Sequence, residues 1–161
     1  MDTMIRVNQI WKHPIYQEQL QALQMLEADR KFCRHTPEHF LDVARLAYIH
    51  ALESHASASK ELIHCTALLH DIGRAEQYRS GIPHDEAGAQ IAEQILRELS
   101  FDPSEIQEIT SAIREHRNAA RSDTLSSLIY DADKASRNCF SCPAEKECYW
   151  SAEKKNLTIT Y

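Results

Sequence analysis

Apolar residues recur at steps of three and four along most of this chain, a spacing that places them on one face of an α-helix. The repeats predict helices over about 15–30, from 37 onward, over about 59–72, after a loop at 79–85, from 103 onward and near 123–137. Alternating strand-forming residues are nearly absent. The sequence therefore predicts an all-α fold.

Two of the predicted helices begin with clear capping signals. Thr36 precedes Pro37, and Thr is a favoured N-cap while Pro is favoured at the first helical position. Asp102 precedes Pro103, and Glu105 stands at the third helical position, which comes close to a capping box. These signals fix where the helices begin.

The adjacent pair His70-Asp71 stands in the last turn of the helix predicted over 59–72, where Gly73 is a natural C-terminal stop. Neighbouring helical residues point about 100° apart, because the helix has 3.6 residues per turn. Such a pair can approach a metal ion from two sides.

Several polar residues occupy positions that should face the core of the helical domain. One histidine on an apolar face is usually a hydrogen-bonded core residue, but a buried carboxylate needs a compensating charge. A divalent metal compensates carboxylates and binds neutral imidazoles, and mixed His/Asp ligation suits Fe, Mn, Zn, Ni or Co better than Mg or Ca. The candidate metal ligands are His39, His70, Asp71, His84, His116 and Asp133.

The segments HFLDVARLA, TALLHDIGR, HDEAGAQIAEQIL, AIREHR and DADKA resemble the successive motifs of HD-superfamily phosphohydrolases, in the family's order over residues 35–137. The resemblance implies a compact bundle of about six to seven helices. It also implies a basic metal set of His39, His70, Asp71 and Asp133. In the family's dinuclear subgroup His84 and His116 complete the site, and Asp71 bridges two divalent ions, with Fe or Mn favoured and Zn, Ni, Co or Mg as alternatives.

Two ligand assignments have competitors. His35 precedes His39 by four residues and could take its place or contact substrate; His39 is preferred because Val43-Ala44 follow it as the family pattern requires. Asp131 competes with Asp133, which is preferred because it directly precedes a basic residue, Lys134.

The resemblance implies metal-assisted hydrolysis of a phosphoester or phosphoanhydride, in which metals activate water and clamp phosphoryl oxygens. Lys134 and Arg74 adjoin the motifs and are the favoured phosphate-binding residues; Arg114, Arg117 and Arg137 are further candidates. We expect a small phosphorylated substrate such as a nucleotide. The same ligand set also occurs in mixed-valent diiron HD oxygenases acting on a polyol or phosphonate, and a nucleotide sensor without turnover is a third reading.

Three cysteines cluster near the C-terminus as Cys139, Cys142 and Cys148, with the spacing C-x2-C-x5-C. This spacing indicates a zinc ion or an iron-sulfur cluster, and both usually need four ligands. Cys33, a histidine or solvent could be the fourth. The alternative interpretation is that these are free thiols on a packed tail. Cys65 lies among apolar residues and is predicted to belong to the core.

Composition narrows the class of protein further. The chain has 161 residues, a hydrophobic content of 43%, a net charge of −6 and a pI near 5.8, which together argue for one globular domain and against a broad nucleic-acid-binding surface. No apolar run approaches the roughly 20 residues that span a bilayer. We expect a cytoplasmic protein with no membrane or nucleic-acid partner.

Two parts of the chain are distinguished. Residues 1–137 are expected to form the metal-binding domain, and 138–161 a Cys-containing appendage packed on it. The segment from 150 to 161 alternates apolar residues, so it could be an extended tail or form a homodimer contact.

Overall fold

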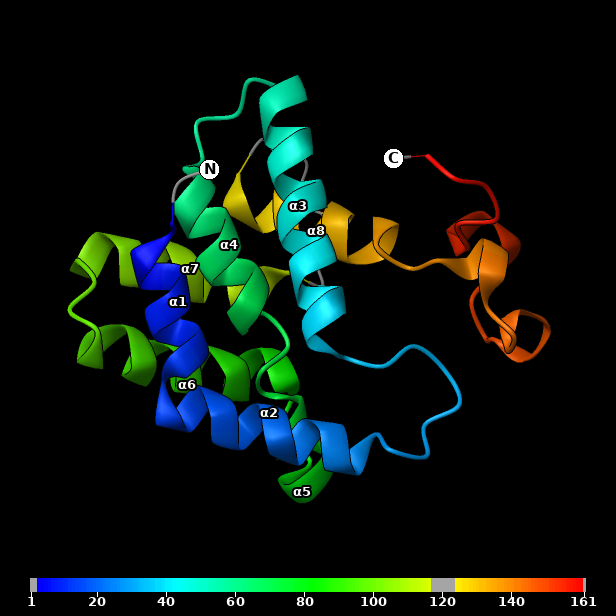
Figure 1. The fold of residues 1–161 in the computed structure, drawn as a ribbon, viewed down its shortest axis with the longest axis horizontal. Helices are drawn as coiled ribbons and strands as arrows, with labels where there is room; N and C mark the ends of the chain where they lie inside the picture. The colour runs from blue at the N-terminus through cyan, green and yellow to red at the C-terminus, as the bar shows by residue number, and fades with distance from the viewer. Residues whose placement is uncertain (1–2, 117–123, 161) are drawn as a thin grey trace.

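The computed structural model describes residues 3–116 and 124–160, and this part of the chain contains helices and no strand (Figure 1). The predicted all-α class is confirmed. The α-helices are α1 (Ile5–Lys12), α2 (Pro14–Leu26), α3 (Pro37–Glu53), α4 (Lys60–Leu69), α5 (Arg74–Ser80), α6 (His84–Glu98), α7 (Pro103–Glu115) and α8 (Leu125–Ala135).

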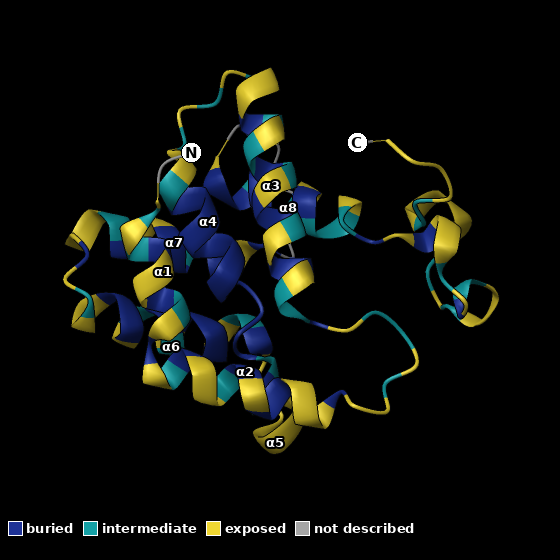
Figure 2. Cartoon of the chain, in the orientation of Figure 1, coloured by how far each residue is buried: buried dark blue, intermediate teal, exposed yellow. Residues whose placement is uncertain are grey.

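Helix α4 lies at the centre of the bundle. It packs against α1, α3, α7 and α8, and every residue from Leu62 to Leu69 is buried. A helix that is apolar all round is stable only when other helices cover it. Figure 2 shows α4 almost wholly buried, whereas the helices around it expose their outer faces.

Two helical hairpins determine where the polar residues lie. Helices α3 and α4 pack together as one pair, α6 and α7 as another, and α8 contacts α3, α4 and α7. The first hairpin turns at 54–59 and the second at 99–102. The start of α3 and the end of α4 therefore lie at the same end of the first pair, and the start of α6 and the end of α7 at the same end of the second.

The predicted helix starts are confirmed. The Thr36 side chain accepts from the backbone N–H of His39, and Pro37 is the first residue of α3. Glu105 accepts from the backbone N–H of Asp102 at 3.1 Å, as a capping box requires.

Other boundaries differ from the prediction. Helices α1 and α5 were not predicted, and α5 takes the first part of the expected loop at 79–85. Helix α4 ends at Leu69, so the His70-Asp71 pair follows the helix instead of occupying its last turn. His84 is the first residue of α6, whereas the sequence placed it just before that helix.

Gly73 has a different role from the helix stop that the sequence suggested. Its φ of −76° is not left-handed, so it does not act as a C-terminal glycine cap. A Cβ at this position would lie 2.2 Å from the carbonyl oxygen of His84 and 2.3 Å from the backbone nitrogen of Gly88. Glycine is needed because the turn after Asp71 packs directly on the backbone of α6.

The C-terminal residues form a tail of three single-turn 3-10 helices, Cys139–Ser141, Glu145–Glu147 and Ala152–Lys154. The last of these interrupts the extended segment considered for 150–161. Figures 1 and 2 show this tail beside the bundle, connected after α8 and largely exposed. No helix within the described residues has the length and apolar character to cross a membrane.

Candidate metal centre

Every candidate metal ligand lies at or near a helix end. His39 is the third residue of α3, His84 the first of α6, and Asp133 the third from the end of α8. His70 and His116 are the residues that directly follow α4 and α7. Because these ends converge, residues up to 94 positions apart in sequence form one site.

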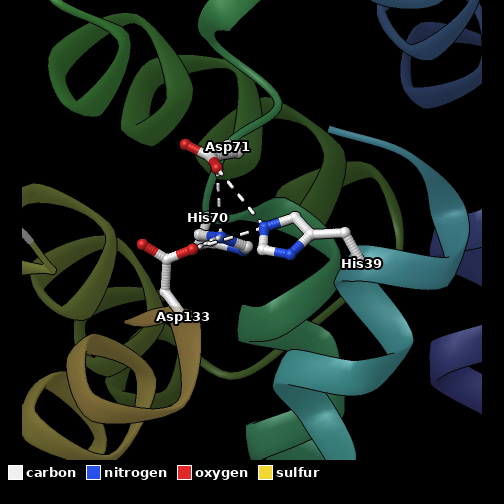
Figure 3. A group of neighbouring side chains, drawn as sticks. All are labelled: His39, His70, Asp71 and Asp133. Carbon is white, nitrogen blue, oxygen red and sulfur yellow. Dashed lines mark ion pairs between the residues drawn. The ribbon is translucent and has the colours of Figure 1, made fainter. Parts of the chain in front are cut away.

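The first group joins His39, His70, Asp71 and Asp133 (Figure 3). Each offers a ligand atom, and these atoms all lie within 4.8 Å of one another. Asp71 Oδ2 lies 3.2 Å from His70 Nε2, and Asp133 Oδ1 lies 3.3 Å from His39 Nε2. Figure 3 shows dashed lines from each carboxylate to both imidazoles, with Asp71 above them and Asp133 at the lower left.

The second group joins Asp71 with His84 and His116 at the same spacing. It uses the other carboxylate oxygen: Asp71 Oδ1 lies 3.3 Å from His84 Nε2 and 3.8 Å from His116 Nε2. The two Nε2 atoms lie 3.3 Å apart. Asp71 therefore presents one oxygen to each group, which is the arrangement a bridging carboxylate requires.

Five histidines at the site use the same hydrogen-bonding arrangement. In each, Nδ1 lies within hydrogen-bond distance of an oxygen, which leaves Nε2 for the centre of the site. Such bonds fix the tautomer and orientation of metal-binding imidazoles. The pairs are His35 with Glu27 Oε1 (2.7 Å), His39 with Ser136 Oγ (3.1 Å), His70 with Ala67 O (2.7 Å), His84 with Gln77 Oε1 (2.8 Å) and His116 with Ile113 O (2.5 Å).

Burial and charge at the centre fit a cation. His70 and Asp71 are fully buried, and neither His70 Nε2 nor Asp71 Oδ2 has a hydrogen-bond partner among residues 3–116 and 124–160. Burial alone would raise the pKa of Asp71, but the charges of His70 and Arg74 hold that pKa well below its usual range. Buried polar atoms left without partners are costly, and a metal ion satisfies both at once.

The pKa of His70 responds to the same charges. Burial by itself lowers this pKa, but Asp71 and Asp133 outweigh burial and raise it to about 10. The metal-free site therefore keeps a proton on His70 at neutral pH.

Two arginines also contact the carboxylates. Arg74 Nε donates to Asp71 Oδ1 at 2.8 Å, and Arg137 Nη2 donates to Asp133 Oδ1 at 3.1 Å. Arg137 Nη2 also donates to His39 Nε2 at 3.1 Å. These bonds engage atoms that a metal ion would use.

His35 lies beside the first group and is not one of its members. Its Nε2 lies 3.5 Å from Asp71 Oδ2, while its Nδ1 and backbone N–H both contact the buried Glu27. Tyr78 donates a further bond to Glu27 at 2.9 Å. Burial would raise the pKa of Glu27, but the hydrogen bonds and charge of His35 lower it to about 2. Glu27, which the sequence analysis did not identify, thus orients His35 toward the metal centre.

An open cleft of about 670 Å³ borders the second group. It is lined by His84, His116 and Asp133, by the cations Arg74, Lys134 and Lys154, and by aromatic residues of α8 and the tail (Tyr130, Tyr149, Trp150). Lys134 is half-buried, and its Nζ lies 3.3 Å from the centroid of the Tyr130 ring.

Some candidate residues lie elsewhere. Asp131 is exposed and belongs to neither metal group, although it lines the cleft. Arg114 is exposed and lines none of the cavities around the described residues of the site. Arg117 falls outside the described residues.

Comparison with known proteins identifies the family. Residues 36–138, most of the chain, match the family model of the HD domain. A protein of Clostridium beijerinckii described as uncharacterized is 42% identical over 158 residues, which cover 98% of this chain and 100% of that protein.

A solved structure shares the fold. The crystal structure of a predicted HD superfamily hydrolase from an uncultured Thermotogales bacterium superposes with a TM-score of 0.65, at 24% sequence identity. The match covers 89% of this chain and 80% of the other.

Proposed function

Because this chain belongs to the HD domain family, we propose that it is a metal-dependent phosphohydrolase with a dinuclear centre. The observation that carries the proposal is the position of Asp71, whose two oxygens each face one of the two ligand groups. His39, His70 and Asp133 would hold one ion, and His84 and His116 the other, with Asp71 shared. When bound, such a pair of ions supplies Lewis acidity and a water of lowered pKa.

Residues around the centre would bind the phosphoryl group. Arg74 lies beside Asp71 and lines two of the cavities next to the site, and Lys134 lines the larger of these two. Cations at such positions bind the non-reacting oxygens of a phosphate and offset its charge. His35, held by Glu27 and lying beside Asp71, would contact the substrate.

The cleft supports a small phosphorylated substrate, with a nucleotide as the favoured class. Its volume of about 670 Å³ lies within the roughly 300–1,000 Å³ of small-molecule sites. Cations gather near the carboxylates, while Tyr149 and Trp150 lie on the tail side, where a planar base could stack.

Metal analysis of protein purified without oxygen tests the proposal, followed by a screen of nucleotides and phosphoesters with Mn²⁺ or Fe²⁺ added. Wild-type protein should bind about two ions per chain and hydrolyse at least one of these compounds. His70→Ala or Asp71→Ala should lose metal and hydrolysis together.

His64→Ala is the matched control. His64 is also buried on α4, but its Nδ1 bonds to the carbonyl of Lys60 and it belongs to neither metal group. This variant should keep both metal and activity.

Three outcomes would contradict the proposal. If metal content were unchanged in both His70→Ala and Asp71→Ala, the metal would not be bound at this site. Oxygen consumption with a polyol or phosphonate, without phosphatase activity, would assign an oxygenase. Tight nucleotide binding without turnover under any metal would assign a sensor.

A further inference from the structure

Four of the five cysteines line one cavity. Cys33 comes from the connection between α2 and α3, whereas Cys139, Cys142 and Cys148 come from the tail. All are free thiols, so no disulfide links the tail to the bundle. Burial raises the pKa of the Cys33 thiol, and Cys139 and Cys142 lie near enough to raise it further.

The tail needs something beyond apolar packing to hold it. Among residues 138–160 only Cys139 and Ala144 are buried, and the helices are single 3-10 turns. So small an apolar core cannot stabilise a fold by itself, and short segments of this kind usually depend on disulfides or metals. Polar contacts add some support, notably Asn156 with the carbonyls of Lys134 and Arg137.

The contacts between the tail and the α2–α3 connection surround the cysteines. Phe32 meets Tyr149 edge to face with ring centroids 6.4 Å apart, and Lys31 pairs with Glu147. Phe32 directly precedes Cys33, and Lys31 stands one residue earlier. Glu147 and Tyr149 stand on either side of Cys148 in the sequence. The chain is thus arranged to bring Cys33 to the three tail cysteines.

The spacing and volume favour a cluster over a single ion. Zinc holds sulfur at about 2.3 Å, so four thiolates on one zinc lie close together. The two groups within the described residues whose ligand atoms all lie within 4.8 Å of one another contain no cysteine. The cavity has a volume of about 130 Å³, whereas one water needs only ~10–15 Å³ of such space.

We propose that Cys33, Cys139, Cys142 and Cys148 ligate a [4Fe–4S] cluster, in which each thiolate binds a different iron and the sulfurs are spread apart. The aromatic residues Phe32 and Trp150, both partly buried, line the same cavity and would shield the cluster from solvent. This site shares no ligand with the dinuclear centre and does not depend on its activity.

The cluster would also form one wall of the approach to the metal centre. The cysteine-lined cavity is bordered by His35, Arg74 and Asp133 as well. Cys33 stands only two residues before His35. By joining the tail to the α2–α3 connection, the cluster fixes the part of the chain that carries His35.

Iron and acid-labile sulfide in anaerobically purified and reconstituted full-length protein test the proposal. We expect about four sulfides per chain, a broad visible absorption band and a paramagnetic signal after reduction with dithionite. Sulfide is decisive because a dinuclear iron centre contributes none. Asp71→Ala should therefore keep its sulfide while losing metal from the other site.

Cysteine variants identify the ligands. Cys33→Ser and Cys142→Ser should each lower sulfide and the visible band at least several-fold. Cys65→Ala is the control, because Cys65 is buried within α4 and does not line the cavity, and it should keep both.

Zinc bound by these cysteines without sulfide would overturn the proposal, as would wild-type protein that takes up neither metal nor sulfide. Sulfide unchanged in Cys33→Ser would overturn the role of Cys33. Iron and sulfide are measured on wild-type protein and single variants, so the result does not depend on whether the protein hydrolyses phosphoesters.

Discussion

At the scale of single residues, the metal centre depends on oxygen atoms that orient its histidines. His70 and His116 bond to backbone carbonyls three residues earlier, in the last turns of α4 and α7, so backbone atoms orient their rings. His35 and His84 instead depend on the side chains of Glu27 and Gln77. Side-chain partners can be removed without altering the backbone, which makes their contribution measurable.

Glu27→Gln should lower kcat by roughly 10–100-fold with metal content unchanged, because a neutral amide orients His35 less firmly. Steady-state kinetics and metal analysis of the same preparation measure this. Glu98→Gln is the control, since Glu98 pairs with His13 at 3.1 Å outside the site. Equal losses in both variants would mean that the effect is general and not specific to His35.

Metal binding should release a proton at about pH 7, because the pKa of His70 in the metal-free site is about 10 and a ligand imidazole must be neutral. The sign follows from the raised pKa. Protonated His70 stabilises the metal-free fold fully when the pH is below the ordinary pKa of histidine, and this stabilisation is lost as the pH rises through about 10. Apparent metal affinity should therefore increase with pH.

Calorimetric titration with Mn²⁺ in two buffers of different ionisation enthalpy measures the released proton. A binding heat that is the same in both buffers would show that His70 is already neutral in the metal-free protein.

Some residues of the site could be predicted from the sequence, and others could not. His39, His116 and Asp133 are recognisable because they continue apolar helix faces, and the resemblance to HD-superfamily motifs adds His70, Asp71 and His84. Glu27 is not, because it is one of several charged residues in the helix predicted over about 15–30, and only the folded chain brings it to His35. Cys33 was one of several options for a fourth ligand until the fold placed it with the tail cysteines.

At the scale of secondary-structure elements, the close approach of Gly73 to α6 positions His84 beside Asp71. Gly73→Ala should destabilise the protein by about 3 kcal/mol, because backbone atoms cannot give way to the added methyl group. Gly81→Ala is the contrast: it has free space but a φ of 79°, so about 1 kcal/mol is expected.

Urea unfolding of both variants measures the difference. A cost at Gly73 no larger than at Gly81 would mean that α5 and α6 move apart easily and that their contact does not hold the site.

Helix prediction succeeded where apolar faces or caps were strong and missed the weakest helices. Helix α5 buries only Ala75 and follows the preceding turn directly, so its sequence has no apolar stripe to detect. Helix α1 buries only Val7 and Ile10 in eight residues. Both form because tertiary contacts with α2, α4 and α6 stabilise them.

At the scale of the whole molecule, the two hairpins hold the metal ligands at one end and their connecting turns at the other. Each begins and ends at the metal centre, so the turns at 54–59 and 99–102 lie at the other ends of their helix pairs. Added residues there would lengthen the connection without shifting a ligand.

These two turns are consequently the places where the chain can be interrupted. A reporter peptide inserted at 54–59, or new termini created at 99–102, should leave the ligands in position. The same insertion between Asp71 and His84 would separate the two halves of the site. The domain can thus gain new segments at one end while its chemistry at the other stays unchanged.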